Sequence, residues 1–166
     1  MSSDQEVRNS ILVMLNREFY RWVKRLSEDK NFATCVALSD RAVEEQYDME
    51  LVLRFIIFRS LSQMSLAKIG DLGEFLTDEA KSRAQEKDFD YAAEEEVFRD
   101  TFALLAETLG DDAFRRYDTQ RKRFVGGFSV SAYYYWVIKL DGSPPVAEGF
   151  AEARSMLERY DSRACR

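Results

Sequence analysis

The densest run of apolar residues in this chain extends from Asp48 to Phe58 and reads Asp-Met-Glu-Leu-Val-Leu-Arg-Phe-Ile-Ile-Phe. Its apolar side chains take almost every direction around a helix, and a helix that is hydrophobic on all sides belongs inside a domain. Glu50 and Arg54 interrupt the run four residues apart, in the order that favours an ion pair on one helix face. The pattern predicts a central apolar helix over about 48–62, capped by Asp48 and carrying one internal ion pair.

An amphipathic pattern fills the first part of the chain. The segment from Ser3 to Glu6 has the sequence of a capping box, in which the first and last side chains satisfy the free N–H groups at a helix start. The apolar positions that follow recur at helical spacing: Val7, Ile11, Leu12, Leu15, Phe19, Val23 and Leu26. Asn16 lies within this series, so we expect a bend or a break between two shorter helices there.

The opposite side of the same pattern is charged. Its members are Arg17, Arg21, Lys24 and Glu28. A row of cations can follow a phosphate backbone, whereas charged outer faces are also the rule for amphipathic helices. The second interpretation needs no ligand, and we prefer it.

Further helical segments follow along the chain. They are expected at 31–38, after Asp71 with Leu72, Phe75 and Leu76 inward, at 90–109 before Gly110, after Ser129, and at 148–160. Gly and Pro are scarce, at seven and two residues, which favours helices joined by short polar loops. We predict an all-α fold, an irregular bundle of about six to eight helices around the central one. A core domain would span 1–142, and a linker turn with a C-terminal helix, 143–166, would pack on it.

Composition narrows the function. The 166 residues are 46% hydrophobic and 33% charged, which is typical of one globular domain. There is no histidine, which excludes Ser-His-Asp and Cys-His catalysis and histidine-based metal sites. Cys35 and Cys165 have no spacing pattern, and no Gly-rich phosphate loop is present. We therefore expect no enzyme, and no catalytic, cofactor-binding or metal-binding residues.

The ends and the net charge bear on location. The N-terminus has no basic stretch followed by an apolar one, and no apolar run reaches about 18 residues. The net charge of −6 disfavours general polyanion binding. We expect a cytoplasmic protein without a membrane partner.

Acidic residues dominate the segment 71–112, which contains fourteen acidic and four basic residues and so has a local charge of −10. Carboxylates such as those of Glu94, Glu95 and Glu96 can bind a hard cation. Three consecutive acids on a helix point in different directions, however, and so make a poor cage. We prefer a solvated face.

The sign of the charge changes directly afterwards. The segment 113–127 contains the bases Arg115, Arg116, Arg121, Lys122 and Arg123, and its aromatic residues are Phe114, Tyr117 and Phe124. Cations that hold phosphates beside rings that stack on bases are typical of single-stranded nucleic-acid binding. Alternatively, the rings anchor a loop to the core and the bases pair with the acidic helix before it.

Several of these pieces together resemble a bacterial family. They are Ser3–Asn9 opening a helix, the stretch from Phe19 to Phe32, Arg41 followed by Met49–Phe55, Leu72–Leu76, and Ala113–Arg115 before the basic segment. They resemble the domain of unknown function 262 group, typified by GmrSD-type modification-dependent restriction proteins. The resemblance extends to about residue 140 and covers the helical region that follows a ParB/sulfiredoxin-like domain in that family.

The resemblance implies a role in phage defence without catalysis by this chain. The Asp-Gly-Gln-Gln-Arg motif of the family's nucleotide-binding domain is missing, and so is its histidine-dependent nuclease module. We expect a helical scaffold or interaction domain with a protein partner or the missing N-terminal domain, and a homo-oligomer is also compatible. The alternative is a nucleic-acid-binding module using 114–124, with DNA as the partner. Arg41, Glu50 and Arg54 would form a structural ion cluster.

Overall fold

A computed structural model describes residues 4–61, 70–118, 120–121, 123–130 and 132–133. Its helices are α1 (Asp4–Leu15), α2 (Arg17–Ser27), α3 (Lys30–Val36), α4 (Asp40–Glu44), α5 (Tyr47–Arg59), α7 (Leu72–Gln85) and α8 (Tyr91–Thr108). A 3-10 turn, η1 (Gly110–Asp112), and a hairpin of β1 (Arg116–Asp118) and β2 (Arg123–Val125) follow. The predicted all-α, multi-helix fold is confirmed, with one small hairpin that the sequence patterns did not predict.

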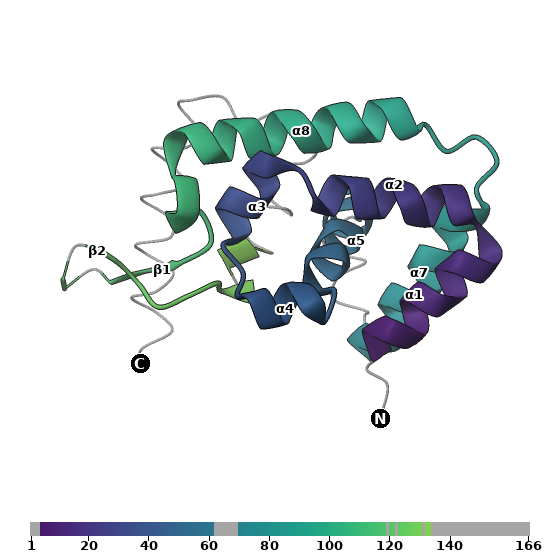
Figure 1. The fold of residues 1–166 in the computed structure, drawn as a ribbon, viewed down its shortest axis with the longest axis horizontal. Coiled ribbons are helices and arrows are strands. Elements are labelled where there is room, and N and C mark those ends of the chain that lie inside the picture. Colours follow the sequence, from purple (N-terminus) through teal and green to yellow (C-terminus); the bar gives the residue numbers. More distant parts are fainter. Residues whose placement is uncertain (1–3, 62–69, 119, 122, 131, 134–166) are drawn as a thin grey trace.

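Helix α5 occupies the middle of the molecule, between α2, α4 and α7 (Figure 1). Nine of its residues are buried, including Glu50, as expected for a helix that is apolar all round. The predicted start is wrong by two residues, since Gln46 is the N-cap and Asp48 lies in the first turn. Gln46 has the left-handed backbone conformation, with φ 58°, which turns the chain sharply between α4 and α5. The helix also ends at Arg59, earlier than predicted.

Asn16 separates α1 from α2, as predicted. Its side chain accepts a hydrogen bond from Phe19 N at 3.0 Å and thus caps α2. The same side chain donates to Ala84 O at the end of α7, at 2.8 Å. One residue therefore both breaks the helix and fixes the corner to a distant segment.

Aromatic rings fill the space between α3, α5 and α8. Phe32 and Phe102 meet edge to face with centroids 4.9 Å apart, and Phe55 meets Phe98 in the same way at 5.3 Å. Helix α8 lies along one edge of the molecule, above α2 and α3 (Figure 1). The helix expected at 90–109 is confirmed as α8, whose N-cap Asp90 accepts a bond from Ala93 N at 3.0 Å. The expected helix start at Asp71 is confirmed as well, since Asp71 caps α7.

The hairpin lies at the opposite end of the molecule from α1 and α7 (Figure 1). After it, Ser129 accepts a bond from Tyr133 N, as expected for a helix start. Tyr133 is buried, and its hydroxyl donates to Leu51 O in α5 at 2.6 Å. Outside the described residues lie Ser3, the predicted C-terminal helix at 148–160, and the part after Tyr133 of the helix expected to follow Ser129.

Helix α1 is rotated relative to the prediction. Of the apolar stripe predicted to point inward, Leu12 is buried, whereas Val7 is 48% exposed and Leu15 is 43% exposed. Arg8 and Asn9, which are polar, are buried beside Leu12. The polar residues of α1 instead find buried partners, and those contacts determine the orientation of the helix.

Candidate interaction surfaces

The ion cluster on α5 contains two of the three predicted members. Glu50 is buried, and its Oε1 accepts from Arg54 Nε at 3.0 Å and from Arg54 Nη2 at 2.9 Å. Its other oxygen accepts from Nη1 of Arg8 in α1. A buried carboxylate is stable only when its lone pairs are satisfied, and two guanidinium groups satisfy this one.

Arg41 is not part of this cluster, and the prediction that placed it there is wrong. Its side chain is 86% exposed and pairs with Glu45 one turn later, at 2.9 Å. Arg41 is close to α5 in the sequence, but it does not reach Glu50, because the turn at Gln46 leaves α4 on the surface with the Arg41 side chain pointing outward. The second arginine that binds Glu50 is instead Arg8, which lies 42 residues before it.

Arg8 also holds α7. Its Nε donates to Thr77 Oγ1 at 3.2 Å and its Nη2 donates to Gly73 O at 3.3 Å. Because Glu50 belongs to α5, this single side chain joins α1, α5 and α7 inside the protein. We call Arg8, Glu50 and Arg54 the inner cluster.

The other polar side chains of α1 hold the turn before α5. Gln5 Nε2 donates to the carbonyl oxygens of Glu45 and Gln46, the former at 2.9 Å. Asn9 Nδ2 donates to Gln46 Oε1 at 2.5 Å. Gln5, Arg8, Asn9 and Leu12 follow one another at helical spacing, so their stripe was visible in the sequence. The stripe was not predicted to be buried, because an arginine is rarely buried without a partner and the sequence does not show which residue the partner of Arg8 is.

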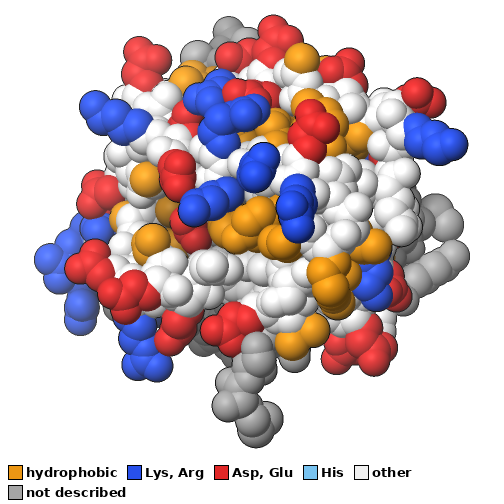
Figure 2. Space-filling model, turned by 45° about the vertical axis from the view of Figure 1, so that its right-hand side comes forward, with side chains coloured by type: hydrophobic (Ala, Val, Ile, Leu, Met, Phe, Trp, Pro, Cys, Tyr) orange, Lys and Arg blue, Asp and Glu red, His pale blue; other side chains and the backbone are white. Residues whose placement is uncertain are grey.

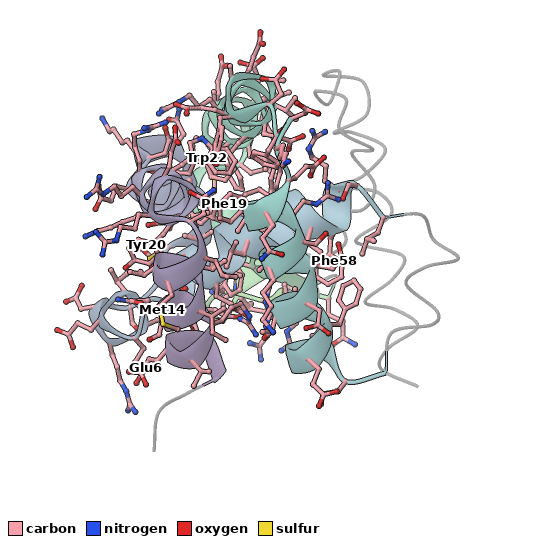
Figure 3. The ribbon with its side chains drawn as sticks, turned by 90° about the vertical axis from the view of Figure 1, so that its right-hand side faces the viewer. Glu6, Met14, Phe19, Tyr20, Trp22 and Phe58 are labelled. Carbon is pink, nitrogen blue, oxygen red and sulfur yellow. The ribbon has the colours of Figure 1, made fainter. Side chains whose placement is uncertain are left out.

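Three apolar residues of α1 are nevertheless exposed. Val7, Met14 and Leu15 are 48%, 78% and 43% exposed; we call them the α1 stripe. Figure 3 shows α1 and α7 side by side, with Met14 at the surface. A shallow groove of about 680 Å³ lies along them, lined by Val7, Asp71, Gly73, Glu74, Thr77, Asp78 and Lys81. An exposed apolar stripe beside a groove is typical of a protein-binding surface.

The α7 side of this groove is acidic. Asp71, the N-cap of α7, and Glu74 and Asp78 within it are exposed and follow one another on one side of this segment, which we call the α7 edge. Lys81 is the base nearest to them among the lining residues, with its Nζ 3.5 Å from Asp78 Oδ1. Both of those side chains are solvated, so this pair offsets little of the negative charge.

The cations of α2 lie on a different surface. Arg17, Arg21 and Lys24 are all exposed, and within the described part of the chain none of them forms an ion pair; we call them the α2 face. In Figure 2, which turns the side with α1 and α2 toward the viewer, Lys and Arg side chains gather near the centre above hydrophobic ones. The predicted charged outer face is confirmed, while its ligand remains untested.

The acids of α8 pair with arginines. Glu94 binds Arg59 of α5 at 2.6 Å. Glu95 accepts from Arg25 at 2.7 Å, from Arg99 at 2.9 Å and from Trp22 Nε1 at 3.1 Å. Burial raises the pKa of Glu95, but these donors outweigh it and lower the pKa below its ordinary value. Over the described ranges, no group of three acids, cysteines or histidines is placed so that it could hold a metal ion. The face that we expected to be solvated is partly engaged in ion pairs, through Glu94 and Glu95.

The basic segment is the hairpin and its flanks. Phe114 is buried against Phe102 and Tyr133, so this ring anchors the segment to the core, as one of the two interpretations held. Arg115 pairs with Asp111 at 3.0 Å and Asp112 at 3.2 Å, which belong to η1 rather than to α8.

Within the hairpin itself, Arg121 pairs with Asp118 at 3.5 Å. Arg116 and Arg123 are exposed and have no ion pair among the residues that the structure places. Lys122 and the side chain of Tyr117 lie outside the described part. Two of the five predicted bases therefore remain available as cations on the described surface.

Cys35 is buried in α3, and its Sγ lies 3.7 Å from Phe102 O. Burial, with a smaller contribution from Asp29, raises the pKa of its thiol to about 12. Thiolates are the reactive form of cysteine, so this group is inert at neutral pH.

Comparisons with known proteins assign no family. No protein-family model matches this chain, no curated protein matches it, and no solved structure matches it. Among the described helices, none combines the length and the apolar character that crossing a bilayer requires.

Proposed function

We propose that this chain is a non-catalytic helical scaffold or interaction domain that contacts a protein partner through the α1 stripe. The observation that supports it is the orientation of α1, which buries Arg8 and Asn9 and exposes Val7, Met14 and Leu15. A helix that stabilised only its own domain would be expected to bury its apolar side.

The inner cluster contributes rigidity to this surface. Arg8 fixes α1 to α5 and α7 through bonds to Glu50, Thr77 and Gly73, so the stripe is held in place before a partner arrives. Preorganised surfaces lose less conformational entropy on binding. The resemblance to the domain of unknown function 262 group suggests the setting, which is a modification-dependent restriction or phage-defence system in the cytoplasm.

A binding experiment tests the proposal. The resemblance points to a ParB/sulfiredoxin-like domain as the partner, and co-elution of such a domain from the same genome with this chain would be measured by light scattering. We expect Met14→Glu with Leu15→Glu to abolish the complex without lowering the melting temperature, because both side chains are exposed. The matched control is Arg116→Glu with Arg123→Glu at the far end. A complex that survives the stripe variant would contradict the proposal.

Nucleic-acid binding by the hairpin remains a second candidate, and the exposure of Arg116 and Arg123 favours it. In the antiparallel register, Arg116 faces Val125 and Asp118 faces Arg123, so both arginines share one face of the hairpin. Phe124 then lies on the opposite face of the hairpin from the two arginines. One nucleic-acid strand could not contact these cations and stack a base on this ring at the same place, which argues against single-strand binding by stacking.

A salt titration tests this candidate with duplex and single-stranded DNA. True phosphate contacts make affinity fall steeply as salt rises. No binding at about 50 mM salt would exclude it.

A further inference from the structure

The α2 face has no partner among the described residues, although it carries three cations in a row. Arg17, Arg21 and Lys24 are spaced by four and then three residues along one side of the helix, and the acid Glu28 ends the row one turn later. At about 1.5 Å per residue they span about 10.5 Å. Arg25, the next base, is already bound to Glu95 and does not belong to this row.

The α7 edge carries the opposite charges at the same intervals. Asp71, Glu74 and Asp78 are spaced by three and then four residues. When the two helices are placed antiparallel, Arg17 meets Asp78, Arg21 meets Glu74 and Lys24 meets Asp71. All three pairs then match in sign and in position along the axis.

We propose that the α2 face of one copy docks along the α7 edge of a second copy, so that the chain associates head to tail. This goes beyond the proposed function, because it concerns contacts between copies and uses neither Met14 nor Leu15, although Val7 of the α1 stripe lines the same groove as the α7 edge. Helices α2 and α7 each pack against α1 (Figure 3), and no ion pair joins the α2 face to the α7 edge among the described residues. The contact that we propose therefore needs another copy.

Two features favour a second copy over nucleic acid as the occupant. A phosphate chain would be attracted by the charge of the α2 face, but it would leave the acids of the α7 edge without a counterpart. In addition, Tyr20, the ring within this face, is partly buried and packed on the core, so it offers little surface for base stacking.

Such a contact is heterologous, since the two surfaces differ. Heterologous contacts form rings or open chains rather than closed twofold dimers. Ion pairs at a solvated interface bind weakly and are screened by salt. We therefore expect an average mass that rises with concentration at low salt and returns toward the 19.3 kDa of one copy at about 0.5 M salt.

Sedimentation equilibrium of the full chain with charge-reversed variants tests the proposal. Arg17→Glu with Arg21→Glu, and separately Glu74→Lys with Asp78→Lys, should each weaken association by about 100-fold or more, because like charges then face each other. Asp71 is left unchanged because it caps α7. The control, Arg116→Glu with Arg123→Glu, reverses the same number of charges on the hairpin and should associate like the wild type.

A combined variant sharpens the test. When all four reversals are placed in one chain, both surfaces change sign, so we expect association to return. An unchanged mass of one copy for the wild type at about 1 mM would overturn the proposal, as would a four-site variant that stays dissociated while folded by circular dichroism. A wild type that stays monomeric but loses oligonucleotide binding on α2 reversal would likewise overturn it and assign the face to a polyanion.

Discussion

The protein contains two arginine–carboxylate clusters built from the same chemistry in opposite surroundings. In the inner cluster, the side chains of Arg8 and Glu50 are only 2% and 6% exposed. In the outer cluster, Glu95 binds Arg25 and Arg99, and Arg99 also binds Asp29 at 2.7 Å. The side chains of Arg25 and Arg99 in that cluster are 59% and 45% exposed.

The two clusters differ in the free-energy cost of removing one member, because the charge that remains is buried in one cluster and hydrated in the other. Buried charges that lose a partner cannot turn to water, so breaking a buried pair costs about 3–5 kcal/mol. Exposed pairs are replaced by hydration, and each contributes about 0.2–1 kcal/mol. The inner cluster therefore fixes the position of α1, while the outer one only reinforces contacts between α2, α3 and α8.

The largest effect is expected for Glu50→Ala. The guanidinium groups of Arg8 and Arg54 would both lose their carboxylate, and the free energy of unfolding should fall by about 3–5 kcal/mol. Urea unfolding measures it.

Glu45→Ala is the matched control, because it also removes a carboxylate from an arginine but at the surface. Its unfolding midpoint should not move measurably. Equal losses in the two variants would mean that burial does not distinguish the clusters, and the comparison would fail.

Arg8→Met should have the next largest effect, about 2–3 kcal/mol. Glu50 would keep Arg54, so the cost is lower than for Glu50→Ala, but the bonds to Thr77 and Gly73 are also lost. Arg41→Met is the control, and we expect it to melt like the wild type. If Arg41→Met lowered the free energy of unfolding more than Arg8→Met did, Arg41 rather than Arg8 would be the second arginine bound to Glu50, as the sequence had predicted.

These two arginines also show how far the sequence leads. The central helix, the break at Asn16, the cap at Asp71, the helix at 90–109 and the pair of Glu50 with Arg54 were all predictable, because each depends on residues within a few positions of one another. The partnership of Arg8 with Glu50 depends on folding across 42 residues. No local pattern contains that information.

The exposed surface of α1 could not be predicted for the same reason, because it also depends on contacts between residues far apart in the sequence. Val7 and Leu15 were recognised as apolar positions of this helix, but their exposure was not predicted, since the rotation of α1 depends on the partners of Arg8 and Asn9. The hairpin at 116–125 was missed because its strands are three residues long and carry charged residues, which gives no alternating apolar signal.

Glu95→Gln should cost less, about 1 kcal/mol at neutral pH, because the side chain remains a hydrogen-bond acceptor near Trp22. The pKa of Glu95 is lowered in the folded protein by its donors. Its carboxylate therefore contributes stability above its unfolded pKa of about 4.3 and loses that contribution as pH falls through the lower, folded value. The difference between wild type and variant, measured by urea unfolding at several pH values, should shrink as the solution becomes acidic. A difference that grows on acidification would contradict the assigned direction.

Salt should produce the smallest effect, and it separates the clusters without further mutation. Raising the salt from about 0.05 to 1 M shortens the screening length from more than 10 Å to about 3 Å. Screening ions reach Glu95 and Arg25 but not Glu50 and Arg8, which are enclosed by α1, α5 and α7. The cost of Glu95→Gln should thus fall by a few tenths of a kcal/mol, while the cost of Glu50→Ala stays constant after correction for the general effect of salt on Glu45→Ala. If both costs fell in parallel, ions would have access to the inner cluster, and its role as the fixed anchor of α1 would be lost.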